Sequence, residues 1–389
     1  MYAIQNKNKI SDNGRRLFEE SGYTVADQLA DPDGIVVHSA PLHDMVFPPK
    51  LKAIIRVGAG VNTIPVDRCT EAGIAVFNTP GGNANAVKEL TLAAMISICR
   101  NVNAASEWLH TLSKEESDYG KTVEKGKEVY VGPELMGKTI GILGVGAVGS
   151  RVARACFDLG MNVIGYDPYL SHLRKLELRQ YLRFTDNIED IYKESDFISV
   201  HVPLDDTTEG MVGRKEIEMM KDGVYLINYA RGPILDNDAV CDALDSGKIK
   251  AFATDFPTDR ELKRKDVFAT PHLGAATPEA ENNCEVMAVK QMKDFLENGN
   301  IANSVNFPDV SFQRADGDRI TLFHKNQVGM LGSITDKVAG LGLNIENLVN
   351  KGRGAYAYTI LDFNTAVPKE LEAALAEVPG VIRVRIIGA

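Results

Sequence analysis

The chain has few of the features that would place it in an oxidising compartment or in a membrane. Its 389 residues include only five cysteines, and no two of them form a Cys-x-x-Cys pair, which argues against a disulfide framework and against a zinc site. The longest apolar run, around residues 92–99, is too short to span a bilayer. The first nine residues lack the apolar core of a secretion signal. We therefore expect a cytoplasmic protein.

Positive charge is also scarce. The sequence has 43 lysines and arginines against 53 aspartates and glutamates, a formal net charge of −10. This balance disfavours nucleic acids and anionic membranes as partners. An anionic ligand would have to be held by a few local cationic groups. The length predicts two or three domains.

The most informative motif lies near the middle of the chain. An apolar run from residue 140 enters a Gly-x-Gly-x-x-Gly turn formed by Gly144, Gly146 and Gly149. The first glycine permits the tight turn, the second lets the backbone approach a pyrophosphate, and the third lets the following helix pack on the strand. The helix predicted over 147–159 would offer the phosphates its first N–H groups, with Ala147 and Val148 at its start.

An acidic residue stands at the distance that a dinucleotide fold requires. Asp167 ends the apolar run that begins at residue 162, about 20 residues after the glycines. Its carboxylate can accept hydrogen bonds from the ribose hydroxyls and would repel a 2′-phosphate. The sequence therefore predicts NAD rather than NADP as the cofactor.

The strand and helix patterns predict α/β domains. Apolar runs alternate with helical stretches before the glycine motif, which indicates a first small α/β unit, and they recur after it as a doubly wound parallel sheet. A long helix is expected over 278–297 and a linker over 299–318. The remaining residues, 319–389, have a strand–helix–strand–strand–helix–strand order of their own. The strands are expected at 34–38, 53–57, 75–77, 162–166, 197–201, 223–228, 251–254 and 267–270.

Three chemically active groups follow predicted strands. Arg231 and His272 each stand just beyond a strand end, where ligands of open α/β sheets bind, and an acidic loop at 254–261 lies between them in the sequence. An arginine can pair two-fold with a carboxylate, and a histidine oriented by an acid can take a hydroxyl proton as hydride leaves the carbon. Each group could instead be structural: Arg231 and Asp255 could cap loops, and His201 could be a packing residue.

Several motifs together resemble the D-2-hydroxyacid dehydrogenase family. They are residues 78–100, the glycine motif, His201-Val-Pro-Leu, Asn228–Gly232 and Pro271-His272-Leu-Gly. Asn303-Ser-Val-Asn-Phe-Pro and the C-terminal unit resemble the phosphoglycerate-oxidising branch of that family. The resemblance implies a Rossmann-like cofactor domain (98–281) inserted in a smaller flavodoxin-like substrate domain (1–97 and 282–312). It also implies a C-terminal ferredoxin-like βαββαβ ACT domain over 318–389.

The same resemblance implies roles for individual residues. His272 would be the acid/base, Arg231 the carboxylate anchor, and Asp259 the acid that pairs with His272. The substrate loop would comprise Arg56, Gly58, Ala59 and Gly60, together with Arg231. The cofactor residues would be Gly144, Gly146, Ala147, Val148, Gly149, Asp167, His201, Pro203, Thr208, Ala230, Asp255 and Gly274.

The acidic loop departs from the family pattern. The family reads Asp-Val-Phe-x-x-Glu-Pro, whereas this chain reads Thr-Asp-Phe-Pro-Thr-Asp-Arg over 254–260. Asp259 takes the place of the glutamate with a side chain one methylene shorter, Glu261 lies close by, and Asp255 is displaced by one position. The choice between Asp259 and Glu261 stays open.

The C-terminal unit resembles an ACT domain, a module that senses small molecules. His324, Asn326 and Asn344 match residues that contact the amino acid in serine-sensing relatives, and Val328 replaces the usual proline. The alternative is a purely structural sheet that pairs subunits.

These resemblances imply NAD-dependent oxidation of D-3-phosphoglycerate to 3-phosphohydroxypyruvate, the first step of L-serine biosynthesis, with L-serine as an inhibitor. A homodimer or homotetramer is expected, with no metal. The alternatives are reduction of another 2-oxo acid, such as 2-oxoglutarate or hydroxypyruvate, and an NAD(H)-sensing corepressor-like protein.

Overall fold

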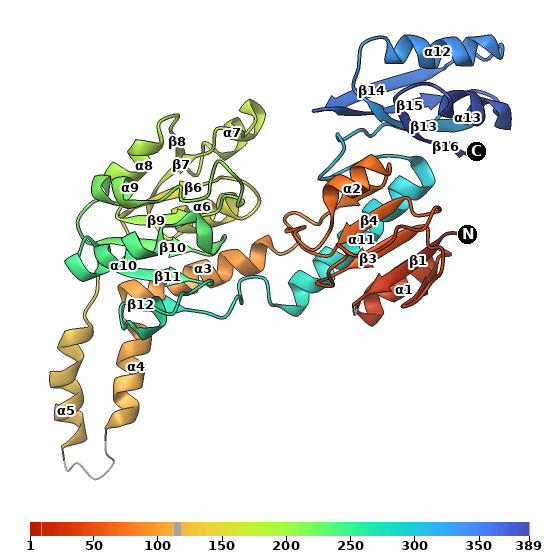
Figure 1. The fold of residues 1–389 in the computed structure, drawn as a ribbon. Helices are drawn as coiled ribbons and strands as arrows, with labels where there is room; N and C mark the ends of the chain where they lie inside the picture. Colours follow the sequence, from red (N-terminus) through yellow and green to blue (C-terminus); the bar gives the residue numbers. More distant parts are fainter. Residues whose placement is uncertain (9, 113–117, 389) are drawn as a thin grey trace. The chain divides into compact units, whose positions relative to one another are not determined.

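The computed structural model describes residues 1–8, 10–112 and 118–388. The chain forms two compact units (Figure 1). One contains Met1–Gly82 with Glu281–Ala389, and the other contains Asn83–Ala280. No helix in the described ranges is long and apolar enough to cross a bilayer.

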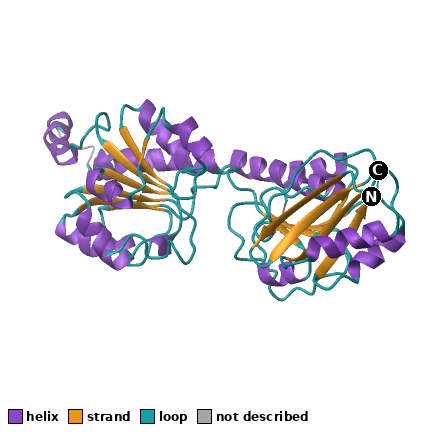
Figure 2. Ribbon diagram, turned by 90° about the horizontal axis from the view of Figure 1, so that it is seen from above, coloured by secondary structure: helices purple, strands orange, loops and turns teal. Residues whose placement is uncertain are grey.

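The unit Asn83–Ala280 is built on a seven-stranded parallel sheet of order β12-β11-β10-β9-β6-β7-β8. Central strands such as β9 and β10 are buried along their whole length, because helices cover both faces of the sheet (Figure 2). The strand order reverses between β6 and β9, which creates the switch point where such sheets bind ligands. The strands are β6 (Thr139–Leu143), β7 (Asn162–Tyr166), β8 (Arg183–Phe184), β9 (Phe197–Val200), β10 (Val224–Asn228), β11 (Ile249–Thr254) and β12 (Val267–Ala269). The helices that cover the sheet are α3 (Ala84–Cys99), α6 (Gly149–Asp158), α7 (His172–Leu178), α8 (Ile188–Glu194), α9 (Arg214–Met219) and α10 (Asn237–Ser246).

A helical excursion separates α3 from β6. It contains α4 (Val102–Thr111), α5 (Tyr119–Gly126) and the 3-10 turn η1 (Lys127–Tyr130). The Trp108 and Tyr130 rings contact each other at 5.6 Å between centroids. The sequence indicated only a polar segment here, because few apolar residues mark a buried face.

The other unit begins with a five-stranded parallel sheet of order β2-β1-β3-β4-β5, the flavodoxin-like order. The fold class expected from the sequence is confirmed for both parallel sheets. The strands are β1 (Ala3–Lys7), β2 (Thr24–Ala26), β3 (Gly34–Val37), β4 (Ala53–Arg56) and β5 (Ala75–Phe77). The helices are α1 (Asp12–Glu20), α2 (Val66–Glu71) and α11 (Pro278–Asn298).

The C-terminal residues form a four-stranded antiparallel sheet of order β14-β15-β13-β16, which confirms the expected ferredoxin-like fold. Ile320 and Leu322 on one face pack against α12 and α13, while the alternate residue Phe323 faces the other way. The elements are β13 (Arg319–Lys325), α12 (Met330–Gly340), β14 (Asn347–Arg353), β15 (Tyr356–Asp362), α13 (Lys369–Ala376) and β16 (Val381–Ile387).

Residues 299–318 do more than connect two domains. Ile301, Phe307 and Val310 are buried, and Ser304 bridges to Phe77 beside β5. The interpretation as a linker missed this packing because the segment has no periodic pattern. It is one reason why the C-terminal sheet belongs to the same compact unit as the flavodoxin-like sheet.

The expected domain boundary near residue 97 falls inside α3. That helix packs on α6, β10 and β11, so all of it belongs to the Asn83–Ala280 unit. The two compact units also divide between Ala280 and Glu281, one residue from the domain boundary expected between 281 and 282, and the three-domain assignment stays a prediction.

Candidate active site

The three glycines of the motif have distinct surroundings after β6. A Cβ on Gly144, whose φ is +85°, would lie 2.8 Å from the His201 carbonyl oxygen, and a Cβ on Gly149 would lie 2.0 Å from the Gly144 oxygen. No heavy atom lies within 4 Å of the position that a Cβ on Gly146 would take. The first and third glycines therefore allow the chain to pack, and the second leaves open space for a pyrophosphate.

The start of α6 is available to a phosphate group. Val148 occupies the N-cap without a side-chain hydrogen bond, and the first turn has no acidic residue. The first N–H groups of the helix are therefore not capped by a side chain, and with Ala147 they fit a dinucleotide phosphate.

Asp167 follows β7 beside this turn. Its Oδ2 accepts a hydrogen bond from the backbone N of Val145 at 2.9 Å, and its Oδ1 accepts one from the N of Tyr169 at 3.0 Å. These bonds fix the carboxylate next to the glycine loop, and its expected contact with the ribose stays a prediction.

The loop after β9 carries three of the expected cofactor residues. His201 donates its backbone N–H to the Leu143 oxygen at 2.7 Å, and its Nε2 lies 2.8 Å from the Ser199 hydroxyl. Burial lowers the pKa of His201 to about 4, so its ring is neutral near pH 7. Thr208 is buried and donates its hydroxyl to the Pro203 oxygen at 2.6 Å, which closes the loop.

Arg231 stands just beyond β10. The buried side chain of Asn228 accepts from the N of Ala230 at 3.0 Å and donates to the Arg231 oxygen at 2.9 Å. These two hydrogen bonds fix the backbone of the loop. The guanidinium carbon of Arg231 lies 5.8 Å from the centre of the Phe256 ring.

His272 adopts a left-handed backbone conformation with φ of 55°. Its N–H donates to the oxygens of Asp255 at 3.1 Å and Thr270 at 3.0 Å, and its side chain is exposed. The Phe256 ring lies 4.7 Å from the imidazole, centroid to centroid. Phe256 therefore contacts both Arg231 and His272, which brings these two expected catalytic residues together.

Phe256 was not among the candidates from the sequence. The available signal was an aromatic residue directly after an acid at a strand end. Aromatic residues usually indicate core positions, so this one was not distinguished.

The carboxylate of Asp255 anchors the loop that carries His272. It is 2% exposed and accepts hydrogen bonds from the Thr270 hydroxyl, from the N of Leu273 at 2.8 Å and from the N of Gly274 at 2.7 Å. A Cβ on Gly274 would lie 3.0 Å from Oδ2, so this position needs a glycine or a shift of the loop. Asp255 was expected to contact the cofactor, and that role stays a prediction; in the structure its carboxylate accepts these three hydrogen bonds from the His272 loop and Thr270.

The two candidate acids have different environments. Asp259 is exposed, whereas Glu261 is fully buried and accepts from the N of Thr258 at 2.6 Å through Oε2. Its Oε1 has no hydrogen-bond partner. Within the described ranges, no hydrogen bond joins either carboxylate to His272. Glu261 closes its own turn, so Asp259 has the freer side chain.

The expected substrate loop lies in the other unit, at the end of β4. The Arg56 guanidinium covers Gly58, whose φ is +127°, since a Cβ there would lie 1.8 Å from Nη1. Gly58 donates to the Thr79 hydroxyl at 2.6 Å, and Asn78 Nδ2 donates to the Ala59 oxygen at 2.6 Å. These two hydrogen bonds fix the backbone at Gly58 and Ala59, and Gly60 follows them in the sequence.

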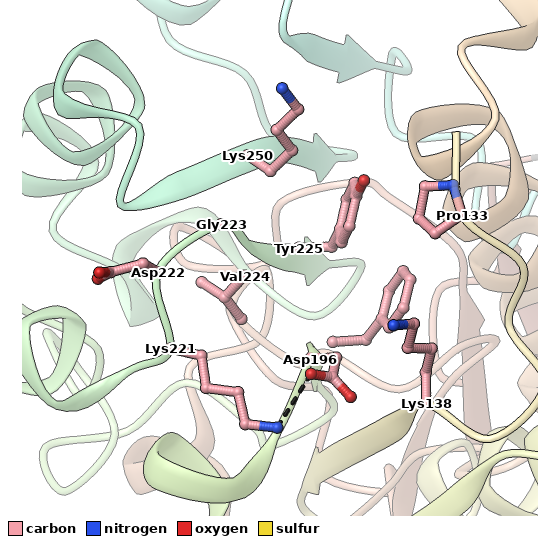
Figure 3. A pocket seen from close by; sticks show the side chains of 10 residues that line it. Pro133, Lys138, Asp196, Lys221, Asp222, Gly223, Val224, Tyr225 and Lys250 are labelled. Atoms are coloured by element: carbon pink, nitrogen blue, oxygen red, sulfur yellow. Dashed lines mark hydrogen bonds and ion pairs between the residues drawn. The ribbon is translucent and has the colours of Figure 1, made fainter. Parts of the chain in front are cut away.

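A pocket of about 310 Å³ in the Asn83–Ala280 unit lies at the amino ends of strands β6, β9 and β10 (Figure 3). Lys138, Asp196 and Gly223, which line it, each precede a strand, and Lys221 pairs with Asp196 at 2.9 Å. The glycine loop, Arg231 and His272 follow strand ends instead. The pocket is therefore separate from the candidate site.

The expected effector residues of the C-terminal domain differ in exposure. His324 is 2% exposed, with Nδ1 2.8 Å from the Lys325 oxygen and Nε2 2.8 Å from the Thr359 hydroxyl. Its side chain is buried within the sheet, and its contact with an effector stays a prediction. Asn326 and Asn344 are exposed.

The sequence is similar to those of several known dehydrogenases and reductases. The family described as D-isomer specific 2-hydroxyacid dehydrogenase, NAD binding domain, matches residues 92–274. D-3-phosphoglycerate dehydrogenase of Methanocaldococcus jannaschii is 33% identical over 87% of this chain, which spans 63% of that protein. The Escherichia coli K12 enzyme of the same name is 31% identical over 87% of this chain and 82% of its own. Hydroxypyruvate reductase of Thermotoga maritima is 35% identical over 74% of this chain and 92% of its own.

Solved structures of similar fold include related reductases. A glyoxylate reductase from Paecilomyes thermophila is 25% identical with a TM-score of 0.65, over 78% of this chain and 98% of its own. The relatives at 31–35% identity and the match over the cofactor domain show that the chain belongs to the D-isomer specific 2-hydroxyacid dehydrogenase family, oxidoreductases that act on CH–OH groups with NAD(P).

Proposed function

We propose that the protein oxidises D-3-phosphoglycerate to 3-phosphohydroxypyruvate. The observation that carries this proposal is the Arg56 guanidinium held over Gly58 at the end of β4, a cationic group suited to a phosphate. Arg231 is suited to a carboxylate, and 3-phosphoglycerate carries both kinds of anion. The similarity to D-3-phosphoglycerate dehydrogenases over 87% of the chain supports the same substrate.

The residues near Phe256 can perform the oxidation. The guanidinium of Arg231 pairs with the substrate carboxylate and fixes the C2 carbon. The imidazole of His272 takes the hydroxyl proton while C2 loses hydride and its C–O bond becomes a carbonyl. The bound nicotinamide supplies the hydride acceptor.

We further propose NAD as the preferred cofactor. The Asp167 carboxylate, fixed by the backbone N–H groups of Val145 and Tyr169, can accept from the ribose hydroxyls. A 2′-phosphate at the same place would meet a negative charge.

A rate assay tests the substrate. In the forward direction, oxidation of 3-phosphoglycerate with NAD should raise the absorbance of NADH. In the reverse direction, 3-phosphohydroxypyruvate should have a higher kcat/KM than hydroxypyruvate or 2-oxoglutarate. The 35% identity to a hydroxypyruvate reductase makes hydroxypyruvate the second candidate. A higher kcat/KM for a non-phosphorylated acid would refute the proposal. NADH binding without turnover of any of these acids would favour a corepressor-like role.

We also propose serine inhibition and a homo-oligomer. β14 lies at an edge of the C-terminal sheet, where an unpaired strand can join another subunit. The exposed residues Asn326 and Asn344 could then contact a serine between two domains. L-serine should lower turnover without competing with 3-phosphoglycerate, and light scattering should show a dimer or tetramer. Asn344→Ala should remove the inhibition and keep basal activity. If millimolar-range serine neither inhibits nor binds by calorimetry, the domain is only structural.

A further inference from the structure

The helix-free face of the C-terminal sheet is part of a larger core. Phe323 on β13 and Tyr358 on β15 belong to one hydrophobic cluster with Phe77 of β5 and Phe295 of α11. The Phe307 and Phe323 rings lie 4.2 Å apart, centroid to centroid. The two domains of this unit therefore share buried apolar surface, rather than meeting only at a covalent connection.

Two buried arginines fix this arrangement. Arg319 is fully buried, pairs with Asp362 at 2.6 and 2.9 Å, and donates to the Asn298 oxygen at 2.8 Å. Arg385 is 6% exposed and donates to the Leu296 oxygen at 3.0 Å. Helix α11 has no basic residue in its last turn. The C-terminal domain thus supplies two arginine donors to carbonyls at the end of the helix, beside the Tyr2 hydroxyl that donates to the same Leu296 oxygen.

From the same domain Arg353, the last residue of β14, reaches the segment before β13. Its Nη1 donates to the Ser304 oxygen at 2.8 Å and to the Phe307 oxygen at 3.4 Å. That segment is hydrogen-bonded to β5: Ser304 Oγ donates to the Val76 oxygen at 3.0 Å, and Asn306 Oδ1 accepts from the Val76 N at 2.9 Å.

The end of β5 in turn holds the substrate loop. Asn78 accepts from Gln291 and donates from Nδ2 to the Ala59 oxygen, and Thr79 accepts from the Gly58 N–H. Thr79 also donates its own N–H to the Gly58 oxygen at 3.0 Å. Hydrogen bonds, joined through the backbone of residues 76–79, therefore connect β14 to the loop that carries the Arg56 guanidinium.

We propose that Arg353 is a positioning residue for the substrate loop, acting through residues 303–307 and the end of β5. The inference rests on the proposed function, in which that loop binds the substrate phosphate. Loss of Arg353 should let the loop fluctuate and weaken the binding of phosphorylated substrate. Hydride transfer in the other unit should be unaffected.

The test compares Arg353→Met, Arg353→Lys and Lys351→Met. Lys351 is the matched control, since it is on the same strand and donates to the Asp309 oxygen at 2.9 Å, outside residues 303–307. Arg353→Met should raise KM for the phosphorylated substrate about three- to tenfold, with kcat and the NADH dissociation constant unchanged. Arg353→Lys should restore part of the loss, and Lys351→Met should behave like wild type.

Hydrogen–deuterium exchange gives a second readout that needs no substrate. Peptides over residues 56–62 and 76–82 should exchange faster in Arg353→Met, while peptides of the Asn83–Ala280 unit stay unchanged. Unchanged KM and exchange in both Arg353 variants would overturn the inference, as would a uniform rise in exchange along the chain. Absence of wild-type turnover of phosphorylated substrate would count against the proposed function instead, and the exchange experiment would still decide the role of Arg353.

Discussion

Replacing Asp255 by asparagine tests what holds His272, the proposed acid/base. The carboxylate accepts three hydrogen bonds, two of them from the backbone N–H groups of Leu273 and Gly274. An asparagine has one oxygen acceptor, so its NH₂ group must face at least one of these N–H donors. A buried donor without an acceptor costs about 1–3 kcal/mol.

That cost falls on the loop that gives His272 its left-handed backbone, a conformation about 1–2 kcal/mol above the usual one. A loss of about 2 kcal/mol in the favoured loop conformation corresponds to a decrease of about 30-fold in kcat/KM. Because the carboxylate bonds to protein groups, we expect the dissociation constant of NADH to change by less than about twofold.

The assay is steady-state turnover, with NADH binding measured separately by fluorescence. Asp266→Asn is the control, because its carboxylate pairs with Arg264 at 2.8 Å and makes no hydrogen bond to the His272 loop. If Asp255→Asn weakens NADH binding and leaves kcat unchanged, Asp255 contacts the cofactor and the reasoning is wrong.

Four further predictions concern single side chains. His272→Asn should lower kcat about 10²- to 10⁴-fold with NADH binding intact, and near-normal turnover would remove it from the mechanism. Asp167→Ala should narrow the ratio of kcat/KM for NAD over NADP, whereas equal wild-type values would refute the NAD preference. If Asp259 pairs with His272, Asp259→Asn should shift the pH profile of kcat/KM downward and Glu261→Gln should not; the reverse pattern would transfer the role. Burial lowers the pKa of His201 to about 4 in the folded protein, whereas the pKa of an unfolded histidine is about 6.5. The unfolded chain therefore binds an extra proton below about pH 6.5, and the free energy of unfolding falls as the pH decreases from about 6.5 toward 4. His201→Gln should therefore reduce the loss of Tm between about pH 7 and pH 5; an unchanged loss would contradict the assigned environment.

Local patterns in the sequence predicted the strands and the glycine turn well. The spacing of Gly144, Gly146 and Gly149 is set by steric requirements within a few residues of the turn. The motif could therefore be recognised from the sequence alone. The β-strands at 75–77 and 162–166 have the predicted bounds, because continuous apolar runs mark strands buried on both faces.

Features that depend on distant partners were not predictable in the same way. His324 is buried on β13 beside β15, where its ring lies within hydrogen-bond distance of Thr359, 35 positions along the chain. The contact of Phe256 with Arg231 and His272 exists only after three strand ends meet at one edge. The packing of residues 299–318 likewise depends on Val76 and Phe77, more than 220 positions earlier.

The core that joins the C-terminal sheet to the flavodoxin-like sheet limits how this protein can change by gain or loss of domains. A chain cut before Arg319 would leave Phe77, Phe295 and Phe307 without the aromatic neighbours Phe323 and Tyr358. It would also leave the end of α11 without the donors Arg319 and Arg385. An ancestor or a designed variant without this domain would need compensating polar substitutions at those aromatic positions. Exchange of the domain between homologues would preserve the interface only if the aromatic and arginine positions were transferred together. We therefore expect these two domains to be gained or lost as a pair.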